Sequence, residues 1–200
     1  HAMSLLQINT LNVRFGDASA VPVVDGLDLA VDAGEIVAIV GESGSGKSTV
    51  GRSLLKLHPG STQITAKALQ FGDVDLLSAS EKAMQKIRGH RISMIMQDPK
   101  YSLNPVKSVG QQVGETAILH LGISRSEARQ RSLAMLEAVQ IRDPELVYDL
   151  FPHQLSGGMG QRVMIAMMLI AEPDLLIADE PTSALDVTVQ NEVLRILDDL

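Results

Sequence analysis

Residues 41–48 read Gly41-Glu42-Ser43-Gly44-Ser45-Gly46-Lys47-Ser48 and match the pattern of glycine, four variable residues, glycine, lysine, and serine or threonine. The apolar run at residues 35–40 predicts a strand before this loop, and residues 47–57 predict a helix after it. In this setting backbone N–H groups and Lys47 bind phosphate oxygens, and Ser48 offers an oxygen to Mg²⁺. The loop therefore predicts a phosphate-binding site.

A pair of carboxylates follows another apolar segment. Residues 175–178 predict a short buried strand that ends in Asp179 and Glu180. Ligands bind α/β sheets beyond the carboxyl ends of the strands. We expect Asp179 to hold Mg²⁺. Because neighbouring side chains on a strand point in opposite directions, we expect Glu180 to act as a general base that orients water toward a γ-phosphorus.

A second anion site is predicted at Ser156, Gly157 and Gly158, which precede an apolar helix expected at residues 161–171. Small residues at a helix N-terminus leave the backbone N–H groups open to an anion. One γ-phosphate cannot bind both this site and Lys47 within a single chain. The sequence therefore predicts two chains that face each other around the nucleotide.

The composition excludes several classes of protein. The 200 residues carry 17 basic and 24 acidic side chains, and the net charge of -7 disfavours broad contact with nucleic acid or an anionic membrane. The chain has no Cys, which excludes disulfides, thiolate zinc sites and cysteine nucleophiles. The longest apolar run, residues 163–171, is shorter than the roughly 20 residues of a membrane span, so we expect none. We also expect no secretory signal, and we interpret residues 1–2 as a cloning remnant.

The remaining pattern alternates strands with helices and predicts a parallel α/β core. Ser78 with Glu81 and Ser124 with Glu127 have the spacing of capping boxes. Residues 99–155 contain no further strand signal and predict a helical insertion. The last helix, with apolar residues from Val189 to Leu200, has no C-terminal cap, so we expect the chain to be truncated within it. We expect strands at residues 5–15, 23–31, 64–71 and 91–97 and helices at residues 81–87, 109–121 and 127–139.

Five segments, in the order in which they occur, resemble those of the ATP-binding subunit of ABC transporters, and the resemblance covers nearly the whole chain. These segments are residues 41–49, Gln97-Asp98-Pro99, Leu155-Ser156-Gly157-Gly158, residues 175–180 and Ser183-Ala184-Leu185-Asp186. Residues 97–105, 152–159 and 178–190 more narrowly resemble the dipeptide, oligopeptide and nickel importer branch.

The resemblance implies an α/β fold of the P-loop NTPase (RecA-like) type. A parallel core would carry an N-terminal antiparallel β subdomain and a helical subdomain at residues 99–155, all within one ATP-binding domain at residues 3–200 that is incomplete at its C-terminus. The implied cofactors are ATP and Mg²⁺. The implied partners are membrane permease subunits that bind the helical subdomain, a second identical or paralogous ATP-binding subunit and, indirectly, an extracytoplasmic solute-binding protein. The implied location is the cytoplasmic face of the inner membrane.

The resemblance also implies roles for single residues. Phe15 would stack on adenine, Gln97 would reach Mg²⁺ and the attacking water, and Asp186 would lie in the dimer seam. The implied catalytic residues are Lys47, Gln97 and Glu180, and the implied metal ligands are Ser48, Gln97 and Asp179. The implied nucleotide-binding residues are Phe15, Gly41, Glu42, Ser43, Gly44, Ser45, Gly46, Lys47, Ser48, Thr49, Ser156, Gly157 and Gly158.

The sequence departs from the family at two places. No His follows His153, so the family's switch histidine is missing, and we expect ATP binding without robust hydrolysis from residues 1–200. Gly160 stands where relatives carry a larger residue, and Gly weakens a helix start by up to roughly 1 kcal/mol relative to Ala. We interpret His58, His90, His120 and His153 as ordinary surface or core residues and expect no metal other than Mg²⁺.

An ATPase that acts on nucleic acid, in repair, chromosome organisation or translation, is the alternative. Repair and chromosome ATPases of this type carry a long coiled coil or a DNA-binding insertion, whereas residues 98–154 contain no sustained heptads. Translation ATPases have tandem domains and basic surfaces, and this chain is acidic. We therefore expect no nucleic-acid partner.

Overall fold

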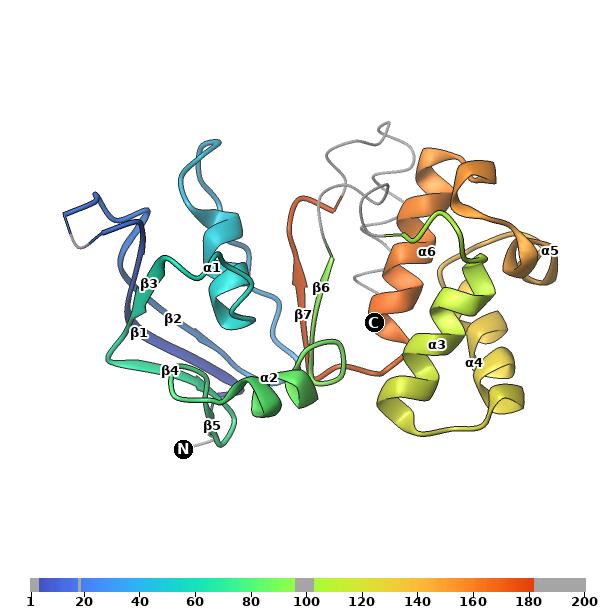
Figure 1. Ribbon diagram of the computed structural model, residues 1–200, viewed down its shortest axis with the longest axis horizontal. Coiled ribbons are helices and arrows are strands. Elements are labelled where there is room, and N and C mark those ends of the chain that lie inside the picture. Colours follow the sequence, from blue (N-terminus) through green and yellow to red (C-terminus); the bar gives the residue numbers. More distant parts are fainter. Residues whose placement is uncertain (1–3, 18, 96–102, 182–200) are drawn as a thin grey trace. The chain divides into compact units, whose positions relative to one another are not determined.

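The computed structural model describes residues 4–17, 19–95 and 103–181. The chain divides into two units, His1–Arg88 and Gly89–Leu200, and each is described by itself (Figure 1). The predictions for Gln97, for Asp186 and for the C-terminal helix lie outside the described residues.

The first unit is built around a five-stranded sheet in which β1 (Leu6–Phe15) is central. It pairs antiparallel with β2 (Val24–Val31) on one side and with β3 (Thr62–Thr65) and β4 (Ala68–Phe71) on the other. β5 (Val74–Asp75) continues the sheet from β4. The helices of this unit are α1 (Lys47–Leu54) and α2 (Glu81–Ile87).

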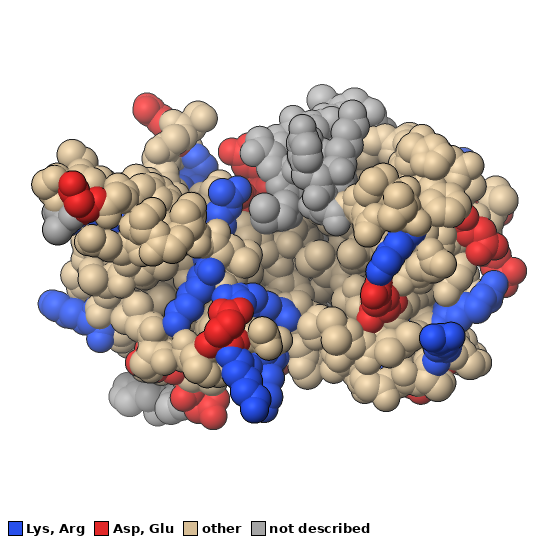
Figure 2. All heavy atoms as spheres, in the orientation of Figure 1, with Lys and Arg blue, Asp and Glu red and all other residues tan. Residues whose placement is uncertain are grey.

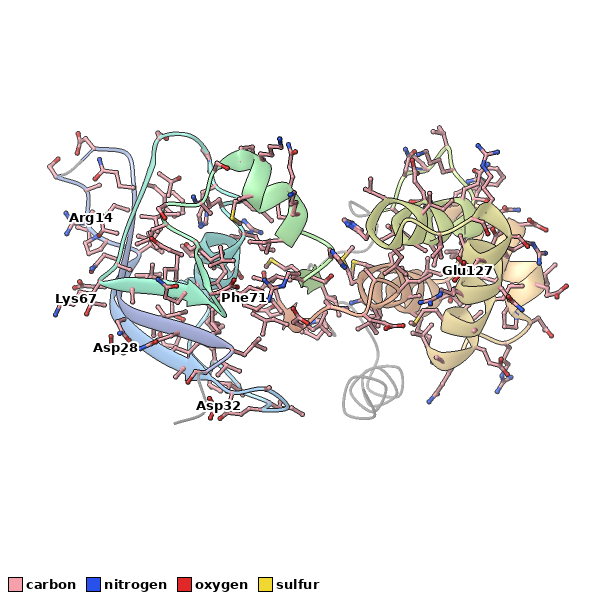
Figure 3. All side chains as sticks on the ribbon, turned by 90° about the horizontal axis from the view of Figure 1, so that it is seen from below. Arg14, Asp28, Asp32, Lys67, Phe71 and Glu127 are labelled. Atoms are coloured by element: carbon pink, nitrogen blue, oxygen red, sulfur yellow. The ribbon has the colours of Figure 1, made fainter. Side chains whose placement is uncertain are left out.

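An irregularity in β1 changes which side chains face the core. Leu6 and Ile8 are buried, but so are Leu11 and Val13. The alternation of buried and exposed side chains therefore shifts by one residue between Ile8 and Leu11. The register shift lies there, and Thr10 has a φ of 54° with its N–H donated to Asp28 Oδ1 at 2.6 Å. An extra residue in one strand has this effect. Figure 3 shows Phe71, from the neighbouring β4, pointing into the unit.

Four predictions for the first unit are wrong. Residues 35–40 form no strand, and Ile36 and Val40 are 79% and 91% exposed. A strand needs a hydrogen-bonding neighbour, and among the described residues this run joins neither sheet. The single strand expected at residues 64–71 is two strands, because the chain turns at Ala66 and Lys67, whose N–H donates to Asn9 O at 2.9 Å.

The third error concerns the residue that caps α2. Its N-cap is Ser80, which accepts from the Ala83 N–H, and Ser78 instead donates to Asp75 Oδ2 at 2.8 Å. The bounds of α2 are as predicted. α1 begins at Lys47 as predicted but ends at Leu54, three residues before the expected end at residue 57.

The second unit joins a pair of parallel strands to a group of helices. β6 (Ile92–Ile95) pairs with β7 (Leu175–Ala178), with Ile92 opposite Leu175 and Ile95 opposite Ala178. α6 (Gly157–Leu169) packs against β6, and α3 (Val109–Leu121) and α4 (Arg125–Ala138) pack against α6 (Figure 1). α5 (Pro144–Asp149) and the 3₁₀ helix η2 (Pro152–Gln154) follow α4.

Local signals explain why these helices form. Ser108 and Gln111 make a capping box at the start of α3, and Gly122 ends this helix in the left-handed conformation. Ser124 caps α4 as predicted, by accepting from the Glu127 N–H. The helices share a core with β6 that includes Ile95, Val113, Leu136, Val163 and Ile165. Among the described residues, we find no helix whose length and apolar character suit a bilayer span.

A tyrosine packs closely against a glycine of α3. A Cβ added at Gly110 would lie 2.2 Å from the Tyr148 ring, whereas one added at Gly114 would have only ordinary contacts, the nearest at 3.6 Å to Ser132 Oγ. The Arg129 guanidinium lies 5.0 Å from the centre of the same Tyr148 ring. The lack of a side chain at Gly110 therefore lets α5 approach α3.

Gly110→Ala and Gly114→Ala separate this packing from helix propensity. Both substitutions favour the helix by up to about 1 kcal/mol, but Gly110→Ala forces the Tyr148 ring to move and should lower the free energy of unfolding by about 1 to 3 kcal/mol. Gly114→Ala should raise it. Urea unfolding followed by circular dichroism measures both, and equal changes in the two variants would contradict the packing described here.

Candidate functional site

The glycine-rich loop leads directly into α1 in the first unit. Residues 41–45 are exposed, and Gly46 is the N-cap of α1 with a φ of 91°. Within the described residues, no side chain caps this helix and no acidic residue lies in its first turn. Its first intrahelical bond runs from the Val50 N–H to Gly46 O at 3.1 Å. The earlier N–H groups have no acceptor within the helix, which makes this end suitable for an anion.

Lys47 connects the two ends of the loop. Its Nζ donates to Gly41 O at 2.8 Å and to Glu42 O at 2.7 Å. The Ser45 N–H also donates to Glu42 O, at 3.2 Å, and closes a turn inside the loop. An ammonium group has three donors, so one N–H remains for another acceptor. The loop is thus held in shape by the same group that carries its positive charge.

Gly46 also fixes the loop against the sheet. A Cβ at this position would lie 2.7 Å from Val23 O, a distance that no side chain tolerates. The Val23 N–H donates to Val13 O at 2.8 Å, so the contact involves the paired ends of β1 and β2. The phosphate-loop candidate therefore lies beside the end of β1 that carries Phe15.

Phe15 is 42% exposed at the end of β1. After the register shift at Thr10 it falls on the same face as Leu11 and Val13, which are fully buried. Its ring meets His58 edge to face, with 5.5 Å between ring centres and 75° between planes. The Phe15 ring is thus partly exposed and contacts the His58 ring on one side.

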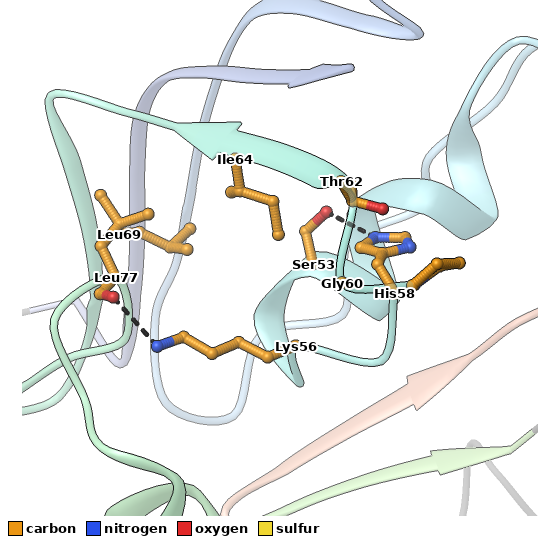
Figure 4. Close-up of a pocket in the computed structure, with 9 residues that line it drawn as sticks. Ser53, Lys56, His58, Gly60, Thr62, Ile64, Leu69 and Leu77 are labelled. Atoms are coloured by element: carbon orange, nitrogen blue, oxygen red, sulfur yellow. Dashed lines mark hydrogen bonds between the residues drawn. The ribbon is translucent and has the colours of Figure 1, made fainter. Parts of the chain in front are cut away.

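His58 is hydrogen-bonded to residues of α1 and lines a cavity of about 260 Å³ (Figure 4). Its Nε2 lies 3.0 Å from Ser53 Oγ and 3.2 Å from Thr49 O. Burial is the main reason that the pKa of His58 is lowered; the bond with the Thr49 carbonyl opposes this, and the Arg52 charge adds to it. The imidazole is therefore mainly neutral at pH 7. Because a carbonyl only accepts, Nε2 carries the proton.

The predicted carboxylates lie at the end of β7 in the second unit. The prediction that this strand is buried is wrong: residues 175–177 are half-buried and Ala178 is exposed, because β6 is the one strand that pairs with β7 among the described residues. The Asp179 N–H donates to Ile95 O at 3.0 Å and extends the parallel ladder by one residue. Asp179 is half-buried and Glu180 is exposed, with a φ of 46° at Glu180. The two carboxylates thus differ in their access to solvent at the carboxyl end of one strand.

The Ser-Gly-Gly segment is the N-terminus of α6. Ser156 is the N-cap and accepts from the Met159 N–H at 3.3 Å. The helix begins at Gly157, so the predicted start at residue 161 is wrong: the cap at Ser156 allows Gly157, Gly158 and Gly160 to be helical. A Cβ at Gly157 would meet nothing within 4 Å, which leaves the helix end open on that side.

Gln161 connects this helix to the segment after the carboxylates. Its side chain is 1% exposed, and Nε2 donates to Pro181 O at 2.5 Å. α6 therefore holds both the Ser-Gly-Gly segment and the residue that follows Glu180. The sequence did not single out Gln161, which lies beside Arg162 at the start of an apolar helix, and nothing local pointed to His58.

The structure thus places Phe15 and residues 41–49 in the first unit and Ser156, Gly157, Gly158, Asp179 and Glu180 in the second. Within the first unit, the phosphate loop and Phe15 flank the same ends of β1 and β2. Within the second, the Ser-Gly-Gly segment and the carboxylates are linked through Gln161. Gln97 lies outside the described residues.

The sequence profile of the family described as "ABC transporter" matches residues 24–183. The chain belongs to the ABC transporter family. This ABC transporter chain is 48% identical over 198 residues to the dipeptide transport ATP-binding protein DppD of Escherichia coli, with 98% of this chain and 60% of DppD covered. It is 47% identical to the probable peptide ABC transporter ATP-binding protein y4tR of Sinorhizobium fredii, with 98% of this chain and 59% of the relative covered.

Among solved structures, this ABC transporter chain is similar to the ATP-binding cassette MJ0796, described as a dimer bound to ADP and Pi in a post-hydrolysis state. The TM-score is 0.84 at 26% identity, with 98% of this chain and 82% of that chain covered. These similarities confirm the predicted ABC ATPase fold. The chain spans less than two thirds of the length of DppD and y4tR.

Gln161→Leu tests the link within the second unit. The variant keeps the side-chain volume but leaves the Pro181 carbonyl without its donor, so the free energy of unfolding should fall by about 1 to 3 kcal/mol. Gln130→Leu, at an exposed position of α4, is the matched control and should change it by less than about 0.5 kcal/mol. Chemical denaturation measures both, and an equal loss in the control would refute the role of Gln161.

Proposed function

We propose that the chain is the ATP-binding and ATP-hydrolysing subunit of an importer that moves peptides or a related small solute through separate permease subunits. The observation that carries the proposal is the loop at residues 41–46, closed by Lys47 at a helix N-terminus without a side-chain cap among the described residues. Relatives that are 46% to 48% identical are named as dipeptide and oligopeptide transport ATP-binding proteins, which supports the solute class.

The side chains proposed for the site have chemistry that suits ATP and Mg²⁺. The exposed loop 41–45, the first turn of α1 and the remaining Lys47 N–H suit the phosphates, and Phe15 offers a partly exposed ring to the adenine. Ser48 and Asp179 supply the oxygen ligands that Mg²⁺ prefers, and we assign Gln97 to the same ion. Mg²⁺, when bound, neutralises charge on the phosphate oxygens.

The remaining site residues have roles in hydrolysis and dimerisation. Glu180 accepts hydrogen bonds from the attacking water and orients it, which its exposed position permits. Ser156, Gly157 and Gly158 bind the nucleotide of a second, identical or paralogous chain through the open N-terminus of α6. Asp186 belongs to the seam between these chains.

The proposed partners follow from the same assignment. We assign residues 3–200 to one ATP-binding domain and residues 99–155 to a helical subdomain that receives the permease subunits. Exposed apolar side chains in that segment, Val106, Leu119, Leu146 and Phe151, support this assignment. The chain then works at the cytoplasmic face of the inner membrane, and an extracytoplasmic solute-binding protein delivers the solute to the permease.

The nucleic-acid alternative has no support from these relatives. On the face shown in Figure 2, Lys and Arg side chains are mixed with Asp and Glu rather than forming a continuous basic band. Near α2, where basic side chains gather, Arg88 is paired with Glu81. A net charge of -7 is also unfavourable for contact with phosphate backbones.

Lys47→Ala tests the phosphate loop. The variant loses the bonds to Gly41 O and Glu42 O together with the charge, so the affinity for Mg-ATP should fall at least about tenfold. Isothermal titration calorimetry measures the affinity. Lys86→Ala, at an exposed position of α2, is the control and should bind like the unmodified chain. Unchanged binding in a folded Lys47→Ala sample would contradict the assignment.

Glu180→Gln tests the chemical step in the full-length protein assembled with its membrane partners. The amide cannot take up a proton from water, so ATP turnover should fall at least about 100-fold while the affinity for ATP stays within about threefold. Phosphate release and nucleotide binding are measured in the same samples. Glu137→Gln, at an exposed position of α4, should leave both unchanged. Normal turnover in Glu180→Gln would exclude it as the base.

A further inference from the structure

Phe15 is the last residue of β1. It is 42% exposed, and the chain has only three Phe, two Tyr and no Trp, so aromatic pairs are rare in it. The ring contact with His58, at 5.5 Å and 75°, has the edge-to-face geometry that aromatic pairs prefer. A ring held on one side in this way keeps its other surface in a defined orientation.

His58 is itself held by α1. Ser53, which is fully buried, donates from Oγ to Thr49 O at 2.7 Å, and His58 Nε2 lies within hydrogen-bond distance of both of these residues. Figure 4 shows the bond between His58 and Ser53 beside the cavity. Thr49 is two residues after Lys47, so His58 is attached to the first turns of the helix that begins at the phosphate loop.

The surroundings keep the imidazole neutral and fixed. Among the described residues, Arg52 has a charge that adds to the lowering of the pKa of His58, and Lys56 lines the same cavity. Lys56 Nζ donates to Leu77 O at 2.9 Å and to Ala79 O at 2.8 Å, so its charge has acceptors of its own. Thr62, which lines the cavity from β3, is paired with Phe15 in the β1–β3 ladder and is uncharged.

We propose that His58 is a positioning residue for the nucleotide base: it connects the Phe15 ring to α1 and so holds the base-stacking surface at a fixed place relative to the phosphate loop. The inference rests on the proposed function, in which Phe15 stacks on adenine. The contribution is preorganisation, because a ring that is already held loses less conformational freedom when a base binds. His58 itself touches neither the phosphates nor the reacting atoms in this assignment.

The test compares a ligand that has a base with one that has none. Calorimetry with Mg-ATP and with magnesium tripolyphosphate measures how much affinity the base adds. His58→Ala should lower the affinity for Mg-ATP by about threefold to tenfold and leave the affinity for tripolyphosphate within about twofold. His90→Ala, which removes a ring contact with His120 in the second unit, is the matched control and should change neither affinity.

Two further variants separate positioning from folding. In a Phe15→Ala background, His58→Ala should have no additional effect on Mg-ATP affinity, because the ring on which it acts is gone. His58→Gln keeps a donor where Nε2 lies and loses the ring, so it should fold like the unmodified chain and still show part of the loss. Circular dichroism checks the fold of each variant.

The outcomes distinguish this inference from the function on which it rests. If the unmodified chain binds neither ligand, both are overturned. If Phe15→Ala reduces the advantage of Mg-ATP over tripolyphosphate but folded His58→Ala and His58→Gln do not, the role of His58 alone is overturned. Equal losses of affinity for Mg-ATP and for tripolyphosphate in the His58 variants would show damage to the phosphate loop. This result would also overturn the proposed role of His58.

Discussion

The arrangement of the first unit depends on the absence of a side chain at Gly46. The Val23 carbonyl lies where a Cβ would be, 2.7 Å away, and the positive φ of this residue turns the loop into α1. Three features follow from that contact: the helix starts at Lys47, the lysine reaches back to the loop carbonyls, and the ends of β1 and β2 lie beside the loop. Any larger residue at this position separates the sheet from the helix.

The second unit uses one helix for two purposes. α6 begins at the capped Ser-Gly-Gly segment, and one turn later Gln161 holds the carbonyl of Pro181, just after the carboxylates. A helix turn is rigid compared with a loop, so Gln161 holds the Pro181 carbonyl at a fixed place relative to the Ser-Gly-Gly segment. In the proposed function, this links the residues that bind a partner's nucleotide to the residue that orients water.

The sequence predicted those elements whose signals are local. α2, α3 and β7 have the predicted bounds, because each combines an apolar pattern with a cap or a turn at its ends. The prediction of a strand at residues 35–40 was wrong, because an apolar run forms a strand only beside a neighbouring strand, and the local sequence does not show whether one is present. The turn at Ala66 and Lys67 contains neither Gly nor Pro, so residues 64–71 looked continuous.

The candidate site divides in the same way. The phosphate loop was predicted from its residue spacing, and the carboxylates from an apolar strand that ends in Asp179 and Glu180. The importance of His58 instead depends on a contact with a residue 43 positions earlier and on a hydrogen bond to a backbone carbonyl. Neither leaves a pattern in the sequence. Nothing in the sequence around His58 distinguishes it from other half-buried histidines, because its ring contact is with Phe15 on β1.

Lys47 donates hydrogen bonds to both the Gly41 and the Glu42 carbonyls, so the shape and the charge of this loop cannot be varied separately. Replacing the lysine by a neutral residue without a donor removes both hydrogen bonds as well as the cation, and Arg substitutes a flat, forked group for a tetrahedral one. A variant at this position is therefore never a simple charge deletion. The same two hydrogen bonds also tie the backbone at Gly41 and Glu42 to the first residue of α1.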